Sequence, residues 1–152
     1  MFTLFKKKQL FFSEEERKQI VEAVRLAELR TSGELMVYVE NHCRYMDALD
    51  RAAEVFLKLK MEETKDRNAV LVYVALKDRQ LAIFGDEGIH QKVGMDYWNE
   101  KVQVMISNFN KENYADGIRH CVLDIGEALH THFPYYKDID KNELPDDIVF
   151  GK

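Results

Sequence analysis

Acidic side chains gather at three points of this sequence, each next to an apolar run that is typical of a β-strand. Carboxylate oxygens that several separate segments contribute are the ligands that Ca²⁺ and Mg²⁺ prefer in proteins. An arginine beside such a cation could stabilise the negative charge that develops on a phosphate group. The candidate ligands of the cation are Glu34, Asp66, Asp86 and Glu87, with Arg67 as the cationic candidate beside them.

The strands that position these residues can be predicted from short apolar runs. Residues 35–39 and 69–76 are too short and too rich in β-branched residues for helices, and they predict two buried strands. Apolar residues at helical spacing predict a helix over about residues 45–62, which makes a parallel β-α-β unit. A polar break at residues 77–79 then predicts an antiparallel hairpin strand at residues 81–85. All the acidic candidates therefore meet at one end of the sheet.

Helices are predicted to cover this sheet. Ser13 and Glu16 form a capping box, in which the side chain of each residue bonds the backbone N–H of the other, so a helix begins there. Apolar stripes over residues 98–109 and 114–129 predict two C-terminal helices, with room for a short helix after Gly85. The expected fold class is α/β: a three-layer α/β/α sandwich with a small mixed sheet.

Length and composition fit one compact domain. The chain has 152 residues, of which 46% are hydrophobic and 32% charged, and it has only 7 glycines and 2 prolines, which excludes a disordered or repetitive architecture. The predicted domain covers residues 13–133. An aromatic and basic segment, residues 1–12, precedes it, and a weakly patterned tail, residues 134–152, follows it.

Composition and charge also predict a cellular compartment and argue against a nucleic-acid partner. The apolar runs are well short of the ~20 residues of a membrane-spanning helix. The N-terminal charges follow a very short apolar run, whereas an export signal has them before a longer one. Cys43 and Cys121 form no CxxC pair, which favours a reduced, cytoplasmic chain. With 22 basic against 27 acidic residues and no basic patch, we expect no nucleic-acid partner.

Residues 1–12 mix phenylalanine and leucine with three consecutive lysines, at positions 6–8. This mixture is typical of segments that lie on a membrane surface. One interpretation is that the segment docks on a membrane surface or on a membrane-associated protein partner. The alternative is that its aromatic side chains pack on the sandwich while the lysines face water.

The acidic candidates also have a purely structural interpretation. Asp66 could form an ion pair with Lys65 or Arg67 on a solvated loop, and Asp86 could cap the helix that follows it. The sequence leaves both interpretations open.

Three other groups of potential ligands or nucleophiles have structural explanations. His42 and Cys43 are consecutive in an extended segment, so their side chains point to opposite faces and His42 is poorly placed to activate the thiol. His130 and His132 do not share a helical face, as a metal-binding pair needs. An acidic run in the tail starts like an EF-hand loop but lacks its glycine and its bidentate glutamate; its residues are Asp138, Asp140 and Asn142.

Several of these segments resemble the TPM domain. The resemblance lies in residues 31–34 and 66–71 at the starts of two strands, in residues 78–85 through the third, and in the aromatic, tyrosine and glycine positions of residues 109–118. That family includes thylakoid-lumen proteins, one of which is described as an acid phosphatase, and bacterial YgcG-like proteins. Membership implies an α/β/α sandwich and a divalent-cation site at the end of the sheet where the acidic candidates meet.

The sequence departs from this family at two points. Family members usually carry an export signal and often a membrane anchor, and the glycine-rich stretch after their third strand is replaced here by residues 85–90. We therefore expect a divalent-cation-binding or interaction module without strong catalysis. The alternative is a metal-dependent phosphatase that acts on phosphomonoesters, in which the acidic cluster holds Ca²⁺ or Mg²⁺ and Arg67 stabilises the developing charge.

Overall fold

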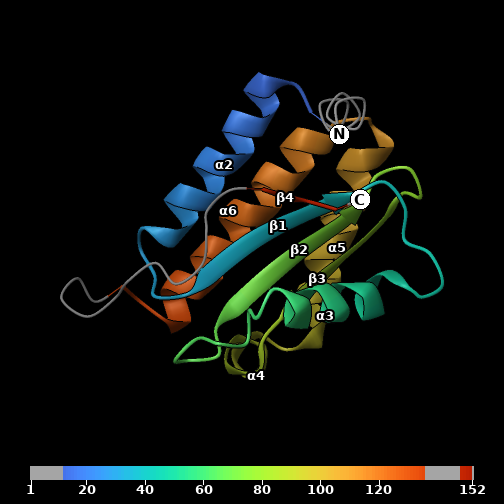
Figure 1. Cartoon of the computed structure of the whole chain (residues 1–152). Helices are drawn as coiled ribbons and strands as arrows, with labels where there is room; N and C mark the ends of the chain where they lie inside the picture. Colours follow the sequence, from blue (N-terminus) through green and yellow to red (C-terminus); the bar gives the residue numbers. More distant parts are fainter. Residues whose placement is uncertain (1–11, 136–147, 152) are drawn as a thin grey trace.

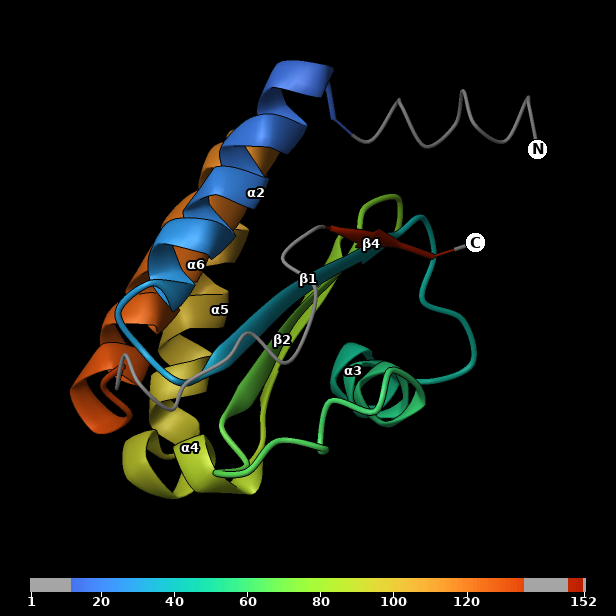
Figure 2. The same ribbon diagram turned by 60° about the vertical axis from the view of Figure 1, so that its left-hand side comes forward.

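The computed structural model describes residues 12–135 and 148–151. In chain order the elements are α2 (Glu14–Glu28), β1 (Glu34–Glu40), α3 (Ala48–Lys58), β2 (Ala69–Ala75), β3 (Gln80–Gly85), α4 (Glu87–Val93), α5 (Met95–Asn110), α6 (Tyr114–His132) and β4 (Val149–Phe150). Within the described ranges, four strands form one sheet (Figure 1). Helix α3 covers one face of this sheet, and α2, α5 and α6 cover the other (Figure 2). The predicted α/β sandwich is confirmed.

The sheet has the strand order β3-β2-β1-β4. Strands β1 and β2 run parallel, from Glu34 opposite Ala69 to Glu40 opposite Ala75, and β3 returns antiparallel beside β2. The predicted β-α-β unit and hairpin are therefore confirmed. Strand β4 lies in the segment that the sequence predicted to be a tail, and it pairs parallel with β1 through Val149. A two-residue strand is too short for a periodic pattern to show in the sequence.

Local signals set where the helices begin. Ser13 accepts a hydrogen bond from the Glu16 backbone N–H, and the Glu16 carboxylate accepts one from the Ser13 N–H, which confirms the predicted capping box. The side chain of Asp47 caps α3. This helix is shorter than the predicted span of residues 45–62, because the cap delays its start and Lys60, with φ 57°, has a left-handed backbone that ends it.

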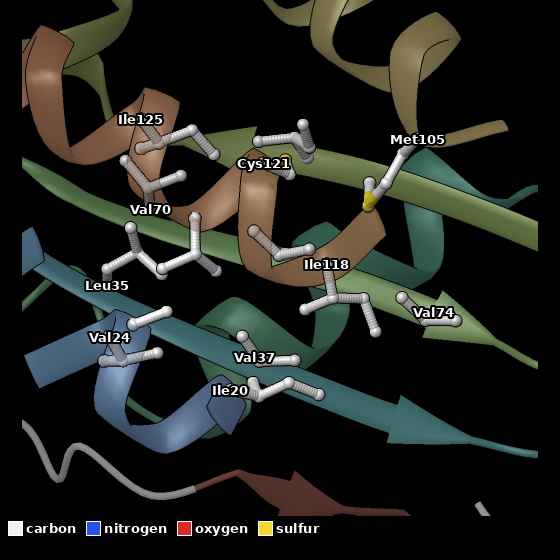
Figure 3. Packing of buried hydrophobic residues seen from close by; sticks show 14 of the residues in the cluster. Ile20, Val24, Leu35, Val37, Val70, Val74, Met105, Ile118, Cys121 and Ile125 are labelled. Atoms are coloured by element: carbon white, nitrogen blue, oxygen red, sulfur yellow. The ribbon is translucent and has the colours of Figure 1, made fainter. Parts of the chain in front are cut away.

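Both faces of β1 and β2 are buried, so successive side chains enter two separate cores. On the face toward α2 and α6, side chains of the strands meet Ile20 of α2 and Ile118 and Ile125 of α6 (Figure 3). On the other face, Phe56 of α3 packs on Phe84 of β3 with ring centroids 4.8 Å apart. Burial on both faces fixes the register of each strand, and with it the positions of the polar residues at the strand ends.

Two predictions fall on segments that lie mostly or wholly outside the described residues. Of residues 1–12 only Phe12 is described, and it is buried in the core, so docking on a membrane or a partner stays a prediction. The residues that imitate an EF-hand loop, Asp138, Asp140 and Asn142, lie outside as well. None of the helices in the described part of the chain has the length and apolar character needed to cross a membrane.

Candidate functional site

Arg67, Asp86 and Glu87 form an ion-pair cluster where β2 begins and β3 ends, which we name the Arg67 clamp. The guanidinium donates from Nε to Asp86 Oδ2 at 2.6 Å and from Nη2 to Asp86 Oδ1 at 2.8 Å. Its third nitrogen, Nη1, donates to Glu87 Oε1 at 3.0 Å. The hydrogen bonds with Asp86 are the main reason that the pKa of Arg67 is raised above its usual value. Bidentate pairing of this kind fixes the orientation of the guanidinium and favours the charged form of both partners.

Asp86 is held in place by the start of α4. Its carboxylate accepts from the Glu87 backbone N–H at 2.8 Å, which confirms that it caps this helix. Its own N–H donates to Ala69 O at 2.9 Å. The residue is only 4% exposed, so Arg67 supplies the counter-charge that a buried carboxylate needs. The ion pairs of Arg67 therefore run to the end of β3, and not to its neighbour Asp66 as one interpretation of the sequence had it.

The loop before β2 and the start of α4 approach each other closely. The Gly88 N–H donates to Arg67 O at 2.8 Å, and a Cβ at Gly88 would lie only 2.1 Å from Asp66 O, so this approach requires glycine. Arg67 itself has φ 51°, a left-handed backbone that costs free energy in any residue other than glycine. Backbone strain and the ion pairs of the clamp thus fall on the same residue.

The loop between α3 and β2 buries three side-chain oxygens that have no hydrogen-bond partner among the described residues. They are Glu62 Oε1, Thr64 Oγ1 and Asn68 Oδ1. Thr64 is 8% exposed and Asn68 is 1% exposed, and the Asn68 amide is oriented by a hydrogen bond from its Nδ2 to Ser32 Oγ at 3.3 Å. Buried polar atoms are almost always partnered in folded proteins, so each exception needs an explanation. Oxygens in this state are available ligands for a hard cation.

The four predicted ligands come together only in part. Asp86 and Glu87 share the Arg67 clamp, whereas Asp66 is exposed on the loop before β2. Glu34 is buried at the start of β1 and pairs with Ala69 of β2, whose other neighbour is Asp86. The backbones of Glu34 and Asp86 are therefore two strand spacings apart, or ~10 Å. In residues 12–135 and 148–151, no three histidine, cysteine, aspartate or glutamate side chains form a group that could hold a metal ion.

Sequence reasoning missed the oxygens of Glu62, Thr64 and Asn68 because it searched for carboxylates beside strand ends. Threonine and asparagine in a polar loop have no spacing that separates a ligand from an ordinary turn residue. The one usable signal was their position, because this loop contains Arg67 and leads directly into β2, at the end of the sheet where the acidic candidates lie.

A second charged cluster lies at the other end of β1 and comprises Glu40, Arg51 and Tyr73; we name it the Glu40 network. Arg51 donates from Nε and Nη2 to the two carboxylate oxygens of Glu40 at 2.9 and 3.0 Å, and the Tyr73 hydroxyl donates to Glu40 Oε2. Its hydrogen bond with Glu40 is the main cause that raises the pKa of Arg51, and burial is the main cause that raises the pKa of Tyr73. Both oxygens of this buried carboxylate are therefore satisfied.

His42 and Cys43 both bind Asp78, which lies in the turn between β2 and β3. His42 Nδ1 lies 2.9 Å from Asp78 Oδ1, and the Cys43 backbone N–H donates to Asp78 Oδ2 at 2.7 Å. The Cys43 thiol donates to Met46 O at 3.3 Å. The side-chain hydrogen bonds of His42 and Cys43 thus run to different residues, in keeping with the expectation that His42 does not activate the thiol.

Comparison with known proteins places this geometry in a family context. The family model described as the TPM domain matches residues 6–128. The NMR structure of the BA42 protein from the psychrophilic bacterium Bizionia argentinensis is 41% identical, has a TM-score of 0.84, and the match covers 93% of this chain and 96% of that one. The N-terminal domain of the cg2496 protein from Corynebacterium glutamicum shares the fold at 13% identity, with a TM-score of 0.62 and coverage of 78% and 74%. No curated protein matches the sequence significantly.

Proposed function

The chain belongs to the TPM-domain family, and on this basis we propose that it is a divalent-cation-binding module whose ligands lie in the α3–β2 loop, beside the Arg67 clamp. Ca²⁺ or Mg²⁺ is the proposed cation, because every candidate ligand is an oxygen atom. The observation that carries the proposal is the group of buried oxygens without hydrogen-bond partners in residues 62–68.

Without a cation these oxygens raise the free energy of the folded loop, and a bound cation would remove that cost. A buried polar atom without a partner costs about 1–3 kcal/mol. The proposal requires one cation to supply the missing partner to three oxygens at the same time: Thr64 Oγ1, Asn68 Oδ1 and Glu62 Oε1. Asp66 lies in the same loop and is exposed, so its carboxylate is the fourth proposed ligand. Two neutral and two charged oxygens suit a hard divalent ion.

Arg67 stands between this loop and the acidic pair at the start of α4. While its guanidinium binds Asp86 and Glu87, these carboxylates are occupied, and their charge is largely neutralised. We propose that they reach the cation only when Arg67 withdraws. Glu34, the most remote of the predicted ligands, would act through its charge alone.

The proposal is tested by titrating the full chain with Ca²⁺ and with Mg²⁺ while backbone amide shifts are followed by NMR. We expect saturable shifts in residues 62–68 and at Gly33 and Asp86. Thr64→Val keeps the shape of the side chain and removes its oxygen, so the affinity should fall by about tenfold, the effect of ~1.4 kcal/mol.

The matched control is Glu63→Gln. Glu63 is an exposed carboxylate in the same loop that is not one of the proposed ligands. Its replacement removes a unit of negative charge but no ligand, so the affinity should change by less than about twofold, as for a screened surface charge. A flat titration in residues 62–68, or an equal loss in both variants, contradicts the proposed site.

A metal-dependent phosphatase is the second candidate, and one observation favours it. The Arg67 side chain is 42% exposed beside the acidic pair, so part of its guanidinium is open to an approaching phosphate oxygen. We would measure turnover of p-nitrophenyl phosphate with and without Mg²⁺. Metal-dependent turnover that is lost in Asp86→Asn supports this activity, and absence of turnover at every metal concentration rejects it.

A further inference from the structure

One flank of α3 carries two exposed leucines with a half-buried alanine between them. Leu49, Ala53 and Leu57 are spaced four residues apart and therefore lie in one line along the helix. Leu49 is 43% exposed and Leu57 is 60% exposed. In the described part of the chain, α3 is the lone helix on its face of the sheet (Figure 2). Single exposed leucines are common on protein surfaces, but two in one line on an otherwise uncovered helix are a candidate contact surface.

A row of charged side chains runs beside the apolar row, one residue further along. It consists of Asp50, Glu54 and Lys58, all exposed. Glu54 is bound by Arg51 of the same helix at 2.5 Å. Among the described residues, no ion pair involves Asp50 or Lys58. The row therefore has an acidic beginning and a basic end, each without an ion-pair partner in the described part of the chain.

We propose that α3 of one copy of this chain pairs antiparallel with α3 of a second copy, about a two-fold axis at Ala53. This arrangement puts Leu49 against Leu57 of the second copy, and Leu57 against its Leu49. The small Ala53 side chains face each other at the centre, where helices at the usual 8–10 Å separation need little volume. The apolar row is self-complementary, as a two-fold interface requires, and Glu54, which faces Glu54 of the second copy across the axis, is paired with Arg51 of its own helix.

Charge selects a second copy as the occupant and fixes its direction. In the antiparallel arrangement Asp50 lies beside Lys58 of the second copy, and the two-fold axis makes this ion pair twice. In a parallel two-fold arrangement the charged rows of the two copies lie on opposite sides of the apolar row, so neither Asp50 nor Lys58 meets the opposite charge there. A foreign helix would have to reproduce the same apolar spacing with the same charge pattern, which α3 itself already has.

The dimer is expected to be weak. Helix α3 has 11 residues, so it is about 16 Å long at ~1.5 Å per residue. One pair of such helices buries less than the ~1,200 Å² that marks the lower end of a standard interface. The dissociation constant should accordingly lie in the range of about 10 µM to about 1 mM, and the measurement must reach the upper end of that range.

Sedimentation equilibrium on the full chain over this concentration range tests the proposal. We expect the average mass to rise from monomer toward dimer, and Leu57→Glu to raise the dissociation constant at least about tenfold, since it puts two charges into the apolar row. Leu29→Glu is the matched control, because Leu29 is similarly exposed, at 53%, but lies at the end of α2. It should leave the dissociation constant unchanged.

A charge exchange separates this interface from any other. Asp50→Lys and Lys58→Asp should each weaken the dimer by about threefold, and the double variant should restore it, because the exchanged pair again has opposite signs. Within one helix the two positions are about 12 Å apart, so the rescue cannot arise inside one chain. A chain that stays monomeric at about 1 mM, or a dimer that is indifferent to Leu57→Glu and to the exchange, overturns the proposal.

Discussion

The Arg67 clamp and the Glu40 network contain the same pairing, an arginine bound to both oxygens of a buried carboxylate, at opposite ends of the sheet. Their surroundings differ. Glu40 has Tyr73 as a further donor, and its arginine sits in a regular helix. Asp86 pairs with an arginine in a left-handed conformation, next to a loop that buries oxygens without partners. The pairing alone therefore says little about function, whereas the unsatisfied and strained neighbours are the features on which the proposed cation site rests.

The largest effect should come from breaking the satisfied cluster. Glu40→Gln removes the negative charge that Arg51 and Tyr73 share, in a place where the Glu40 side chain is only 4% exposed. Breaking a buried ion pair in this way costs about 3–5 kcal/mol, and we expect the lower end because Arg51 can reach water. Urea unfolding followed by circular dichroism measures the loss.

The matched control for this substitution is Glu54→Gln. Glu54 is the other carboxylate that Arg51 binds, at 2.5 Å, but its side chain is 52% exposed. The same chemical change should cost less than about 1 kcal/mol there. Equal losses of unfolding free energy in the two variants would show that burial does not strengthen the Glu40–Arg51 ion pair. The proposed difference between the Glu40 network and the Arg67 clamp would then be contradicted.

At the clamp end the next largest effect should come from Gly88→Ala. The added methyl would lie 2.1 Å from Asp66 O and 2.7 Å from Arg67 O, so α4 must move away from the loop, at about 1–3 kcal/mol. The displacement should also change the amide shifts of residues 62–68. Gly94→Ala is the control, because φ is 81° there and no atom lies within 4 Å of the added methyl. It should cost about 1–3 kcal/mol from its backbone alone, because ψ is 168° there and this region is essentially restricted to glycine, and it should leave the shifts of residues 62–68 in place.

Most of the fold could be predicted because its signals are local. The capping box at Ser13, the unbroken apolar runs of β1 and β2, and the polar break before β3 each specify an element within a few residues. The β-α-β unit has one common handedness and puts the starts of β1 and β2 at the same end of the sheet. The hairpin then brings the end of β3 to that end. Strand β4 was not predicted, because a strand of two residues, Val149 and Phe150, is too short to show an alternating pattern.

The surroundings of the candidate residues were predicted only in part. The sequence placed Asp86 and Arg67 at the same end of the sheet, and one of its two interpretations had Asp86 cap a helix, because both follow from strand direction and from residues next to one another. It did not show that Arg67 turns to Asp86, 19 residues away, because that contact depends on a left-handed backbone and on the closeness that Gly88 allows. Hydrophobic periodicity reports which face a side chain occupies, and it says nothing of its hydrogen-bond partner.

The two arginines should respond in opposite ways to alanine and glycine. Arg67 has φ 51°, so Arg67→Gly should be more stable than Arg67→Ala by about 1 kcal/mol, because glycine carries no penalty in this region. Arg51 lies inside α3, where glycine is worse than alanine by about 1 kcal/mol. Thermal unfolding of the four variants measures both differences. If alanine is the better replacement at both positions, Arg67 stores no strain and the two clusters differ less than proposed.

The smallest effect concerns Asp78, which lies at the same end of the sheet as the Glu40 network. Its pKa is lowered first by the hydrogen bond with His42 and then by the backbone N–H of Cys43. Because the folded-state pKa lies below the unfolded value of ~3.9, folding favours the ionised carboxylate. Its contribution to stability is therefore complete above about pH 4 and is lost as the pH falls through the folded-state pKa. Asp78→Asn should flatten the acid limb of a plot of unfolding free energy against pH below about pH 4. Parallel acid limbs would mean that His42 and Cys43 do not favour the ionised form of Asp78.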